Sequence, residues 1–245
     1  MQLLKNIEAI DLAVLIDKSI LVIADIHIGY EEALNKQGIL IPRFQFRDIV
    51  ERLTNILEKT KPSKIIINGD LKHEFGTISE QEWRDTLRIL NLMEKYTKDI
   101  LLIKGNHDKI LGPIAKKRNI KVLDSYEIPE LSLCICHGDK IVKTDMKSLI
   151  IAHEHPAIRL REHLKSELYK CFLKGSYGKG KSRKTLIVQP SLSLVSEGTD
   201  IAKERLLSPY LQQSLGNFEV FIVGRPFEVL NFGKINKLAK IRESK

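Results

Sequence analysis

The chain has 245 residues, a formal net charge of +9 and 43% hydrophobic residues, enough for a sizeable core in one large domain or two small ones. No run approaches the roughly 18 consecutive apolar residues of a membrane span, and the N-terminus lacks the basic start and long apolar run of a secretory signal. The three cysteines have spacings that fit no zinc motif, and we interpret them as buried thiols of a reducing compartment. We therefore expect a cytoplasmic protein without a membrane partner.

Apolar runs alternate with amphipathic stretches in the first half of the chain. The pattern predicts helices at residues 43–60 and from Ser79, which opens a capping box, to about Tyr96. It predicts strands at residues 12–16, 20–25, 64–69, 100–105, 131–138 and 147–156, with further strands in TLIVQPSLSLV (185–195) and FEVFIVG (218–224). REHLKSELYK (161–170) has a helical pattern, and residues 175–184 form a glycine-rich basic turn. Strand–helix alternation followed by strand-rich sequence indicates an α/β layered fold.

No linker long enough to divide the chain is visible, so we expect a single domain over residues 1–245 with a basic C-terminal tail at about 233–245. The positive charge is concentrated. Residues 157–184 contain nine Lys or Arg against two Glu, and the last fourteen residues add five basic groups against one Glu. A concentrated basic surface favours a polyanionic partner such as nucleic acid. The alternative is a solvated, lysine-rich face of the kind enriched in heat-adapted proteins, and charge alone does not decide between the two.

Five of the seven histidines stand where an apolar strand ends: His27, His107, His137, His153 and His155. Three further polar residues stand in similar places: Asp25, Asp70 and Asn106. Ligands in open α/β sheets are held at the C-terminal ends of strands, so these side chains are expected to converge. Imidazole and oxygen ligands without thiolate fit Mn²⁺, Fe or Zn²⁺, and their number favours two ions that share a carboxylate. The alternative, five separate core or capping histidines, does not explain the matched positions.

The motifs DIH, GDLKH, GNHD, HGD and AHEH, in this order and at these distances, resemble the calcineurin-like metallophosphoesterase superfamily. DIHIG and GDLKH resemble the variants of SbcD-type DNA-repair nucleases. The short chain and LSPYL (207–211) are similar to archaeal SbcD-related phosphoesterases and bacterial ligase-associated endonucleases. The resemblance implies an α/β fold in which a two-sheet β-sandwich is flanked by helices in four αββα layers. It also implies two divalent metal ions, with Mn²⁺ expected and Fe, Zn²⁺ or Mg²⁺ as alternatives.

The resemblance further implies a role for each residue at the strand ends. One metal would be held by Asp25, His27 and His155. The other would be held by Asn106, His137 and His153, with Asp70 bridging the two. His107 would act on the substrate without binding metal, and we expect the adjacent Asp108 to orient it by a hydrogen bond. His73 would contact a phosphate or the leaving group, the alternative being a capping residue after the Asp70 turn.

Two metals about 3.5–4 Å apart activate a water and clamp a phosphoryl group, so phosphoester hydrolysis is expected. The first hypothesis is a phosphodiesterase that cleaves DNA or RNA in connection with repair. Its nucleic-acid contacts would come from the basic turn: Lys174, Tyr177, Lys179, Lys181 and Arg183. The second is a small-molecule phosphatase or cyclic-nucleotide phosphodiesterase. The third, a non-catalytic scaffold, should have lost ligands, and none is missing. The sequence leaves the oligomeric state open, a homodimer being one alternative.

Overall fold

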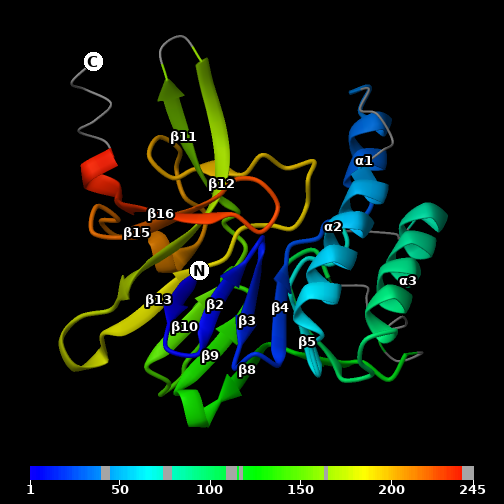
Figure 1. The fold of residues 1–245 in the computed structure, drawn as a ribbon, viewed down its shortest axis with the longest axis horizontal. Coiled ribbons are helices and arrows are strands. Elements are labelled where there is room, and N and C mark those ends of the chain that lie inside the picture. Colours follow the sequence, from blue (N-terminus) through cyan, green and yellow to red (C-terminus); the bar gives the residue numbers. More distant parts are fainter. Residues whose placement is uncertain (40–44, 74–78, 109–114, 116–117, 163–164, 239–245) are drawn as a thin grey trace.

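The computed structural model describes residues 1–39, 45–73, 79–108, 115, 118–162 and 165–238. Within these residues, two β-sheets pack face to face, and three α-helices lie beside the first sheet (Figure 1). The helices are α1 (Tyr30–Lys36), α2 (Gln45–Thr60) and α3 (Glu80–Glu94). The predicted α/β fold with two sheets is confirmed.

The first sheet contains seven strands in chain order: β1 (Gln2–Leu4), β2 (Ile7–Ile10), β3 (Ala13–Ile16), β4 (Ile20–Ala24), β5 (Lys64–Asn68), β6 (Ile100–Ile103) and β7 (Lys121–Leu123). The first four strands pair antiparallel, and β4 to β7 pair parallel. Parallel pairing places the carboxyl ends of β4, β5 and β6 along one edge of the sheet, as the sequence predicted for a ligand site.

The described part of the second sheet has nine strands: β8 (Ser125–Ile128), β9 (Leu133–Cys136), β10 (Ser148–Ile151), β11 (Pro156–Glu162), β12 (Lys165–Tyr177), β13 (Lys184–Val188), β14 (Thr199–Asp200), β15 (Glu219–Val223) and β16 (Val229–Lys234). Their order is β14-β11-β12-β13-β10-β9-β8, with β15 beside β12 and β16 beside β15. Strands β9, β10 and β13 are parallel, so their carboxyl ends also share one edge.

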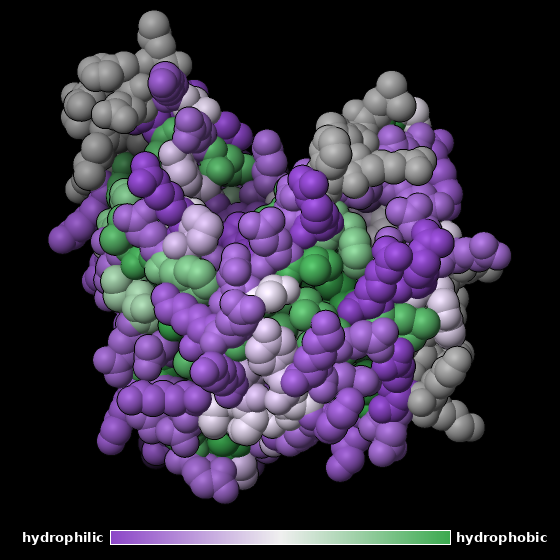
Figure 2. Space-filling view, turned by 45° about the vertical axis from the view of Figure 1, so that its right-hand side comes forward, coloured by the Kyte–Doolittle hydropathy of each residue, from purple (hydrophilic) through white to green (hydrophobic). Residues whose placement is uncertain are grey.

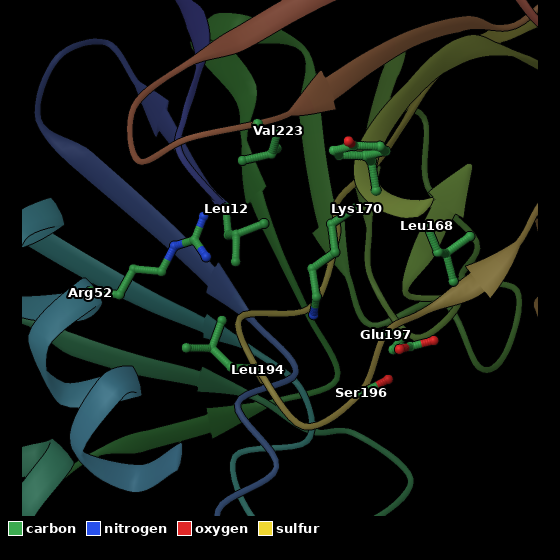
Figure 3. Close-up of a pocket in the computed structure, with 10 residues that line it drawn as sticks. Leu12, Arg52, Leu168, Lys170, Leu194, Ser196, Glu197 and Val223 are labelled. Atoms are coloured by element: carbon green, nitrogen blue, oxygen red, sulfur yellow. The ribbon is translucent and has the colours of Figure 1, made fainter. Parts of the chain in front are cut away.

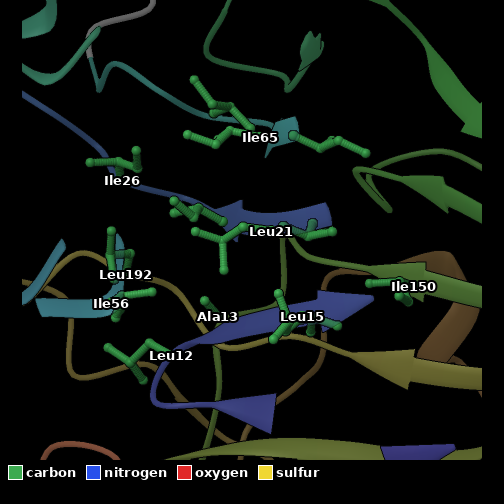
Figure 4. Packing of buried hydrophobic residues seen from close by; sticks show 14 of the residues in the cluster. Leu12, Ala13, Leu15, Leu21, Ile26, Ile56, Ile65, Ile150 and Leu192 are labelled. Atoms are coloured by element: carbon green, nitrogen blue, oxygen red, sulfur yellow. The ribbon is translucent and has the colours of Figure 1, made fainter. Parts of the chain in front are cut away.

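The apolar runs that predicted the strands form the core between the layers. The largest hydrophobic cluster joins both sheets and α2, and Figure 4 shows residues of each: Leu15, Leu21 and Ile65 of the first sheet, Ile150 of the second and Ile56 of α2. A second cluster covers the other face of the second sheet with the segment 201–218, where Tyr210 and Phe218 are buried. Two apolar layers, one between the sheets and one on the outer face of the second sheet, therefore fix the strands that carry the polar ends.

Two helices lie where the sequence predicted them. Helix α3 begins as its capping box indicated, because the Ser79 hydroxyl accepts a hydrogen bond from the Glu82 N–H at 3.1 Å. Helix α2 buries one face, including Leu53 and Leu57, against the sheet, and the first two residues of the predicted helix, 43–44, lie outside the described residues. No helix in the described ranges combines the length and apolar composition needed to cross a membrane.

The helical pattern of residues 161–170 is a wrong prediction. The described residues of this stretch, 161–162 and 165–170, belong to β11 and β12, in which Arg159 pairs with Leu168 and Leu160 pairs with Glu167. Cross-strand pairing satisfies the backbone groups there, and this long-range pairing outweighs the weak local helix preference. The hairpin projects beyond the body of the molecule (Figure 1). His163 lies outside the described residues.

Candidate metal centre

Five chain segments bring their polar ends together between the two sheets. Asp25 directly follows β4, Asp70 lies two residues after β5, and Asn106 lies three residues after β6. From the second sheet, His137 directly follows β9 and His153 lies two residues after β10. The convergence predicted from five unrelated strand ends is therefore what the structure shows.

One group of ligand atoms comes from Asp25, His27 and His155, all within 4.8 Å of one another. The Nε2 atoms of His27 and His155 are 3.2 Å apart, and His155 Nε2 is 3.4 Å from Asp25 Oδ2. These three residues are the set that the resemblance implied for one ion.

A second group comes from Asp70, His137 and His153, again within 4.8 Å. Asp70 Oδ2 lies 3.3 Å from His137 Nε2 and 3.8 Å from His27 Nε2, so it stands between the two groups, as a bridging ligand would. Asn106 Oδ1 is 3.0 Å from His137 Nε2. The structure thus brings all seven predicted ligands together, and the assignment of each residue to an ion stays a prediction.

The donor set fits divalent cations. Asp25 Oδ1 is buried and has no hydrogen-bond partner, an arrangement that a bound cation would satisfy. Burial and the neighbouring His155 lower the pKa of His27 to about 3, so its imidazole is neutral, the form that ligates metals. Burial disfavours a charged His137, but contacts with Asp70 and Asp25 outweigh it and raise the pKa of His137 to about 9. The two carboxylates therefore stabilise a positive charge at this place, and a bound metal ion would supply that charge in place of a proton on His137.

Two glycines let the segments approach one another. A Cβ atom on Gly69 would lie 1.9 Å from Nδ1 of His137, and one on Gly105 would lie 2.1 Å from Oδ1 of Asp70. Gly69 also has a φ of +80°, which side chains other than glycine rarely adopt. The glycines of the GDLKH and GNHD motifs are therefore needed because there is no space for a methyl group beside these ligands.

The predicted catalytic residue His107 lies at the rim of this centre. Its backbone N–H donates to Asp70 Oδ1 at 2.9 Å, and its Nδ1 is hydrogen-bonded to the carbonyl of His73. The ring of His73 stacks between those of His107 and Tyr30, at centroid distances of 5.3 and 4.0 Å. His73 is thus part of the site, and Tyr30 is a site residue that sequence reasoning missed, although an aromatic residue directly after DIHIG was a usable signal.

Asp108 does not lie as expected. Its two carboxylate oxygens accept the backbone N–H groups of Leu71 and Gly105, each at 3.1 Å, and the side chain is buried. The expected hydrogen bond between Asp108 and the His107 ring is not formed; the ring is held by the carbonyl of His73 instead. Burial and the charge of Asp70 raise the pKa of Asp108 to about 7. The role of Asp108 is therefore to join the two loops that carry Asp70 and His107.

The basic turn lies away from the metal centre. Strand β13 runs parallel to β10 and pairs its first residues with the first residues of β10, whereas His153 follows the last ones. Lys174 pairs with Glu219 at 2.8 Å, Arg183 donates to the Ser176 hydroxyl, and Tyr177 packs on Tyr210. Tyr177, Lys179, Lys181 and Arg183 therefore lie at the opposite edge of the sheet from the ligands. Lys174 pairs with Ile187, closer to the carboxyl end of β13, and its amine is engaged by Glu219.

A different basic element adjoins the metal centre. The β11–β12 hairpin begins at Pro156, directly after His155, and carries Arg159, Arg161 and Lys165. Arg161 and Lys165 are exposed. The space-filling view is hollowed at its upper edge, between the side that bears the hairpin and the side that bears α1 (Figure 2). Hydrophilic residues line much of this hollow.

Comparison with known proteins agrees with this fold and identifies the family. The sequence model of the calcineurin-like phosphoesterase family matches residues 18–188, and the chain belongs to this family. Nuclease MPE from Pseudomonas putida has a TM-score of 0.62 at 20% identity, over 92% of this chain and 94% of that one. The phosphoesterase YfcE from E. coli has a TM-score of 0.41 at 12% identity, over 84% and 88%. No curated protein matches the chain significantly. The protein is a metal-dependent phosphoesterase.

Proposed function

We propose that this phosphoesterase is a dinuclear-metal phosphodiesterase that cleaves nucleic acid, in connection with DNA repair, with Mn²⁺ as its metal and the cytoplasm as its location. The observation that carries the chemistry is the convergence of two ligand groups on either side of Asp70. The similarity in fold to a nuclease and the basic hairpin beside the ligands support the substrate class.

Bound divalent ions would supply Lewis acidity that activates a water and neutralises charge on the phosphoryl oxygens. The protein itself orients the proton donor. Nδ1 of His107 is held by the His73 carbonyl, which fixes the orientation of the ring, and we assign the proton transfer to its other nitrogen, Nε2. In its imidazolium form, His107 can then give the Nε2 proton to the departing oxygen. The Asp70 carboxylate fixes the backbone of His107 and also adjoins both ligand groups, so it couples the position of the donor to the position of the ions.

Activity on different phosphoesters tests the substrate class. Purified protein is assayed with Mn²⁺, Fe²⁺, Zn²⁺ or Mg²⁺ against single-stranded DNA, duplex DNA, RNA, a cyclic nucleotide, bis-p-nitrophenyl phosphate and p-nitrophenyl phosphate. We expect cleavage of a nucleic acid and of the diester, with little turnover of the monoester. Preference for the monoester or for the cyclic nucleotide would favour the alternative of a small-molecule enzyme.

Salt dependence of binding locates the nucleic-acid surface. We compare Arg161→Ala/Lys165→Ala on the hairpin with Lys179→Ala/Lys181→Ala in the basic turn, because both pairs remove two positive charges. Each phosphate of duplex DNA that a protein neutralises contributes about 0.9 to the slope of log K against log salt. We expect a slope smaller by about one to two in the hairpin variant and an unchanged slope in the turn variant. The reverse result would show that the basic turn, and not the hairpin, is the surface that binds nucleic acid.

A further inference from the structure

The backbone of Asp25 is held by a segment from the far end of the chain, Ser191 to Ser193. The carbonyl of Asp25 accepts hydrogen bonds from the Ser191 hydroxyl at 2.7 Å and from the Ser193 N–H at 3.2 Å. The Leu192 N–H donates to the carbonyl of Ala24 at 2.9 Å. The segment thus runs along the end of β4 and fixes the residue that presents a predicted metal ligand.

Asp25 needs such support because of its backbone conformation. Its φ is +50°, in the left-handed region, which residues other than glycine adopt only when the surrounding structure holds them there. This conformation turns the carboxylate toward His155 and His137, with Oδ2 also accepting the His153 N–H at 3.0 Å. Without the two hydrogen bonds to its carbonyl, Asp25 would be free to relax toward an ordinary extended conformation and turn its carboxylate away.

Lys170 holds the segment in place. Its Nζ donates to the carbonyl of Ser191 at 2.9 Å and to the carbonyl of Ser193. Figure 3 shows the side chain extending from β12 into a pocket, with Leu12 on one side and Ser196 on the other. Burial and the positive charge of Arg52 lower the pKa of Lys170 to about 7, and the amine has enough N–H groups for both carbonyls in either protonation state. Among the described residues, no carboxylate lies within 4 Å of this amine, so the carbonyls are its main partners.

We propose that Lys170 is a positioning residue of the metal centre: it clamps the Ser191–Ser193 segment, which in turn holds Asp25 in the conformation that binds an ion. Residues that orient metal ligands without touching the metal typically change metal affinity about 10- to 100-fold when replaced. The inference rests on Asp25 being a ligand and is independent of which phosphoester is cleaved.

Manganese binding measures the clamp directly. Metal-free protein is titrated with Mn²⁺ by calorimetry, and the bound ions are followed by electron paramagnetic resonance, without substrate. We expect Lys170→Met to weaken one of the two Mn²⁺ sites about 10- to 100-fold and to leave the other close to wild type. A role in general stability alone would shift the unfolding temperature and leave both affinities unchanged.

The matched control is Lys184→Met. Lys184 also donates to two backbone carbonyls two residues apart, those of Thr144 and Met146, but at the edge of the sheet away from the ligands. Its replacement removes the same kind of hydrogen bonds, and we expect wild-type Mn²⁺ affinity. Equal weakening in the Lys184 and Lys170 variants would overturn the proposal, as would wild-type affinity in folded Lys170→Met.

Ser191→Ala tests the same path with a smaller change, because it removes one hydroxyl, which donates to the Asp25 carbonyl and accepts the Ser193 N–H. We expect it to weaken the same Mn²⁺ site, and the double variant with Lys170→Met to lose less than the sum of the two effects, since both act through one segment. If Lys170→Met does not fold, wild-type Mn²⁺ affinity in Ser191→Ala would by itself reject the clamp. The Mn²⁺ titrations contain no substrate, so they test the clamp even if the nuclease assays show no cleavage of nucleic acid.

Discussion

His107 is fixed differently from the seven predicted ligands beside it. Its backbone is tied to the Asp70 carboxylate and its ring to the His73 carbonyl, so both are held by hydrogen bonds within the protein. A third group of imidazoles, His27, His73 and His107, is nevertheless close enough to hold an ion. Two roles for His107 are therefore to be distinguished by experiment: proton donor to the substrate, as proposed, and metal ligand.

The variant His107→Ala separates these roles. We expect kcat on bis-p-nitrophenyl phosphate to fall about 10²- to 10⁴-fold, the usual contribution of a proton donor, while metal content stays near two ions per chain. Atomic absorption on the purified variant gives the content, and His153→Ala is the control that should lose metal. A metal content near one ion per chain in His107→Ala would show instead that His107 is a metal ligand.

The eight side chains that converge could be predicted from the sequence because each carries a local signal, a polar residue at the end of an apolar strand. The division into seven ligands and His107 came from the family resemblance. Lys170 could not be found in this way. It occurs in the same strand as Lys174, and nothing in the sequence distinguishes a lysine that reaches two carbonyls from one that pairs with Glu219. Asp108 illustrates the same limit, because adjacency to His107 in the chain did not place the two side chains together.

At the scale of elements, the sequence predicted the positions of strands with continuous apolar runs well. It did not predict the direction in which the later strands run. The basic segment 157–184 directly follows the last ligand pair in the sequence, but the chain passes out and back through β11 and β12 before it reaches the basic turn. The turn that joins β12 to β13 therefore lies one strand length from the ligands. Strand polarity depends on long-range pairing, which a local pattern does not contain.

The loops at the strand ends are expected to tolerate almost no added volume. Gly69→Ala combines a left-handed φ, which costs an alanine about 1–2 kcal/mol, with a Cβ 1.9 Å from His137. Overpacking typically costs roughly 1–3 kcal/mol more. We expect a large loss of stability, measured by denaturant unfolding, together with loss of Mn²⁺ binding.

Gly233→Ala is the matched control for Gly69→Ala. Gly233 has the same φ of +80°, and a Cβ atom there would meet no heavy atom of the described residues within 4 Å. Only the conformational cost of about 1–2 kcal/mol should remain, with metal binding intact. Similar losses in the two variants would show that backbone strain, and not the approach of His137, explains the glycine.

At the scale of the whole molecule, the metal centre links two sheets. Asp25, His27 and Asp70 come from the first sheet, and His137, His153 and His155 come from the second. Ions bound between them therefore stabilise the packing of one sheet on the other, in addition to the shared apolar core. Unfolding must release the ions, because the unfolded chain separates the ligands.

Removal of metal should lower the global stability of the protein. An ion present at 100 times its dissociation constant contributes about 2.7 kcal/mol per site to the free energy of unfolding. We expect Mn²⁺ to raise the unfolding temperature of EDTA-treated protein in a concentration-dependent way and to restore activity. The same titration on His153→Ala should give a smaller shift. Identical unfolding curves with EDTA and with Mn²⁺ would mean that the two sheets hold together without the ions.

The hydrogen bond between Ser191 and Asp25 spans 166 residues and has a consequence for protein synthesis. Asp25 leaves the ribosome long before the segment that secures its carbonyl, because Ser191 is made 166 residues later. A nascent polypeptide therefore lacks the support of the Asp25 carbonyl until residues 191–193 have been made. Only after this segment has docked on the end of β4 does the centre have the form seen in the structure.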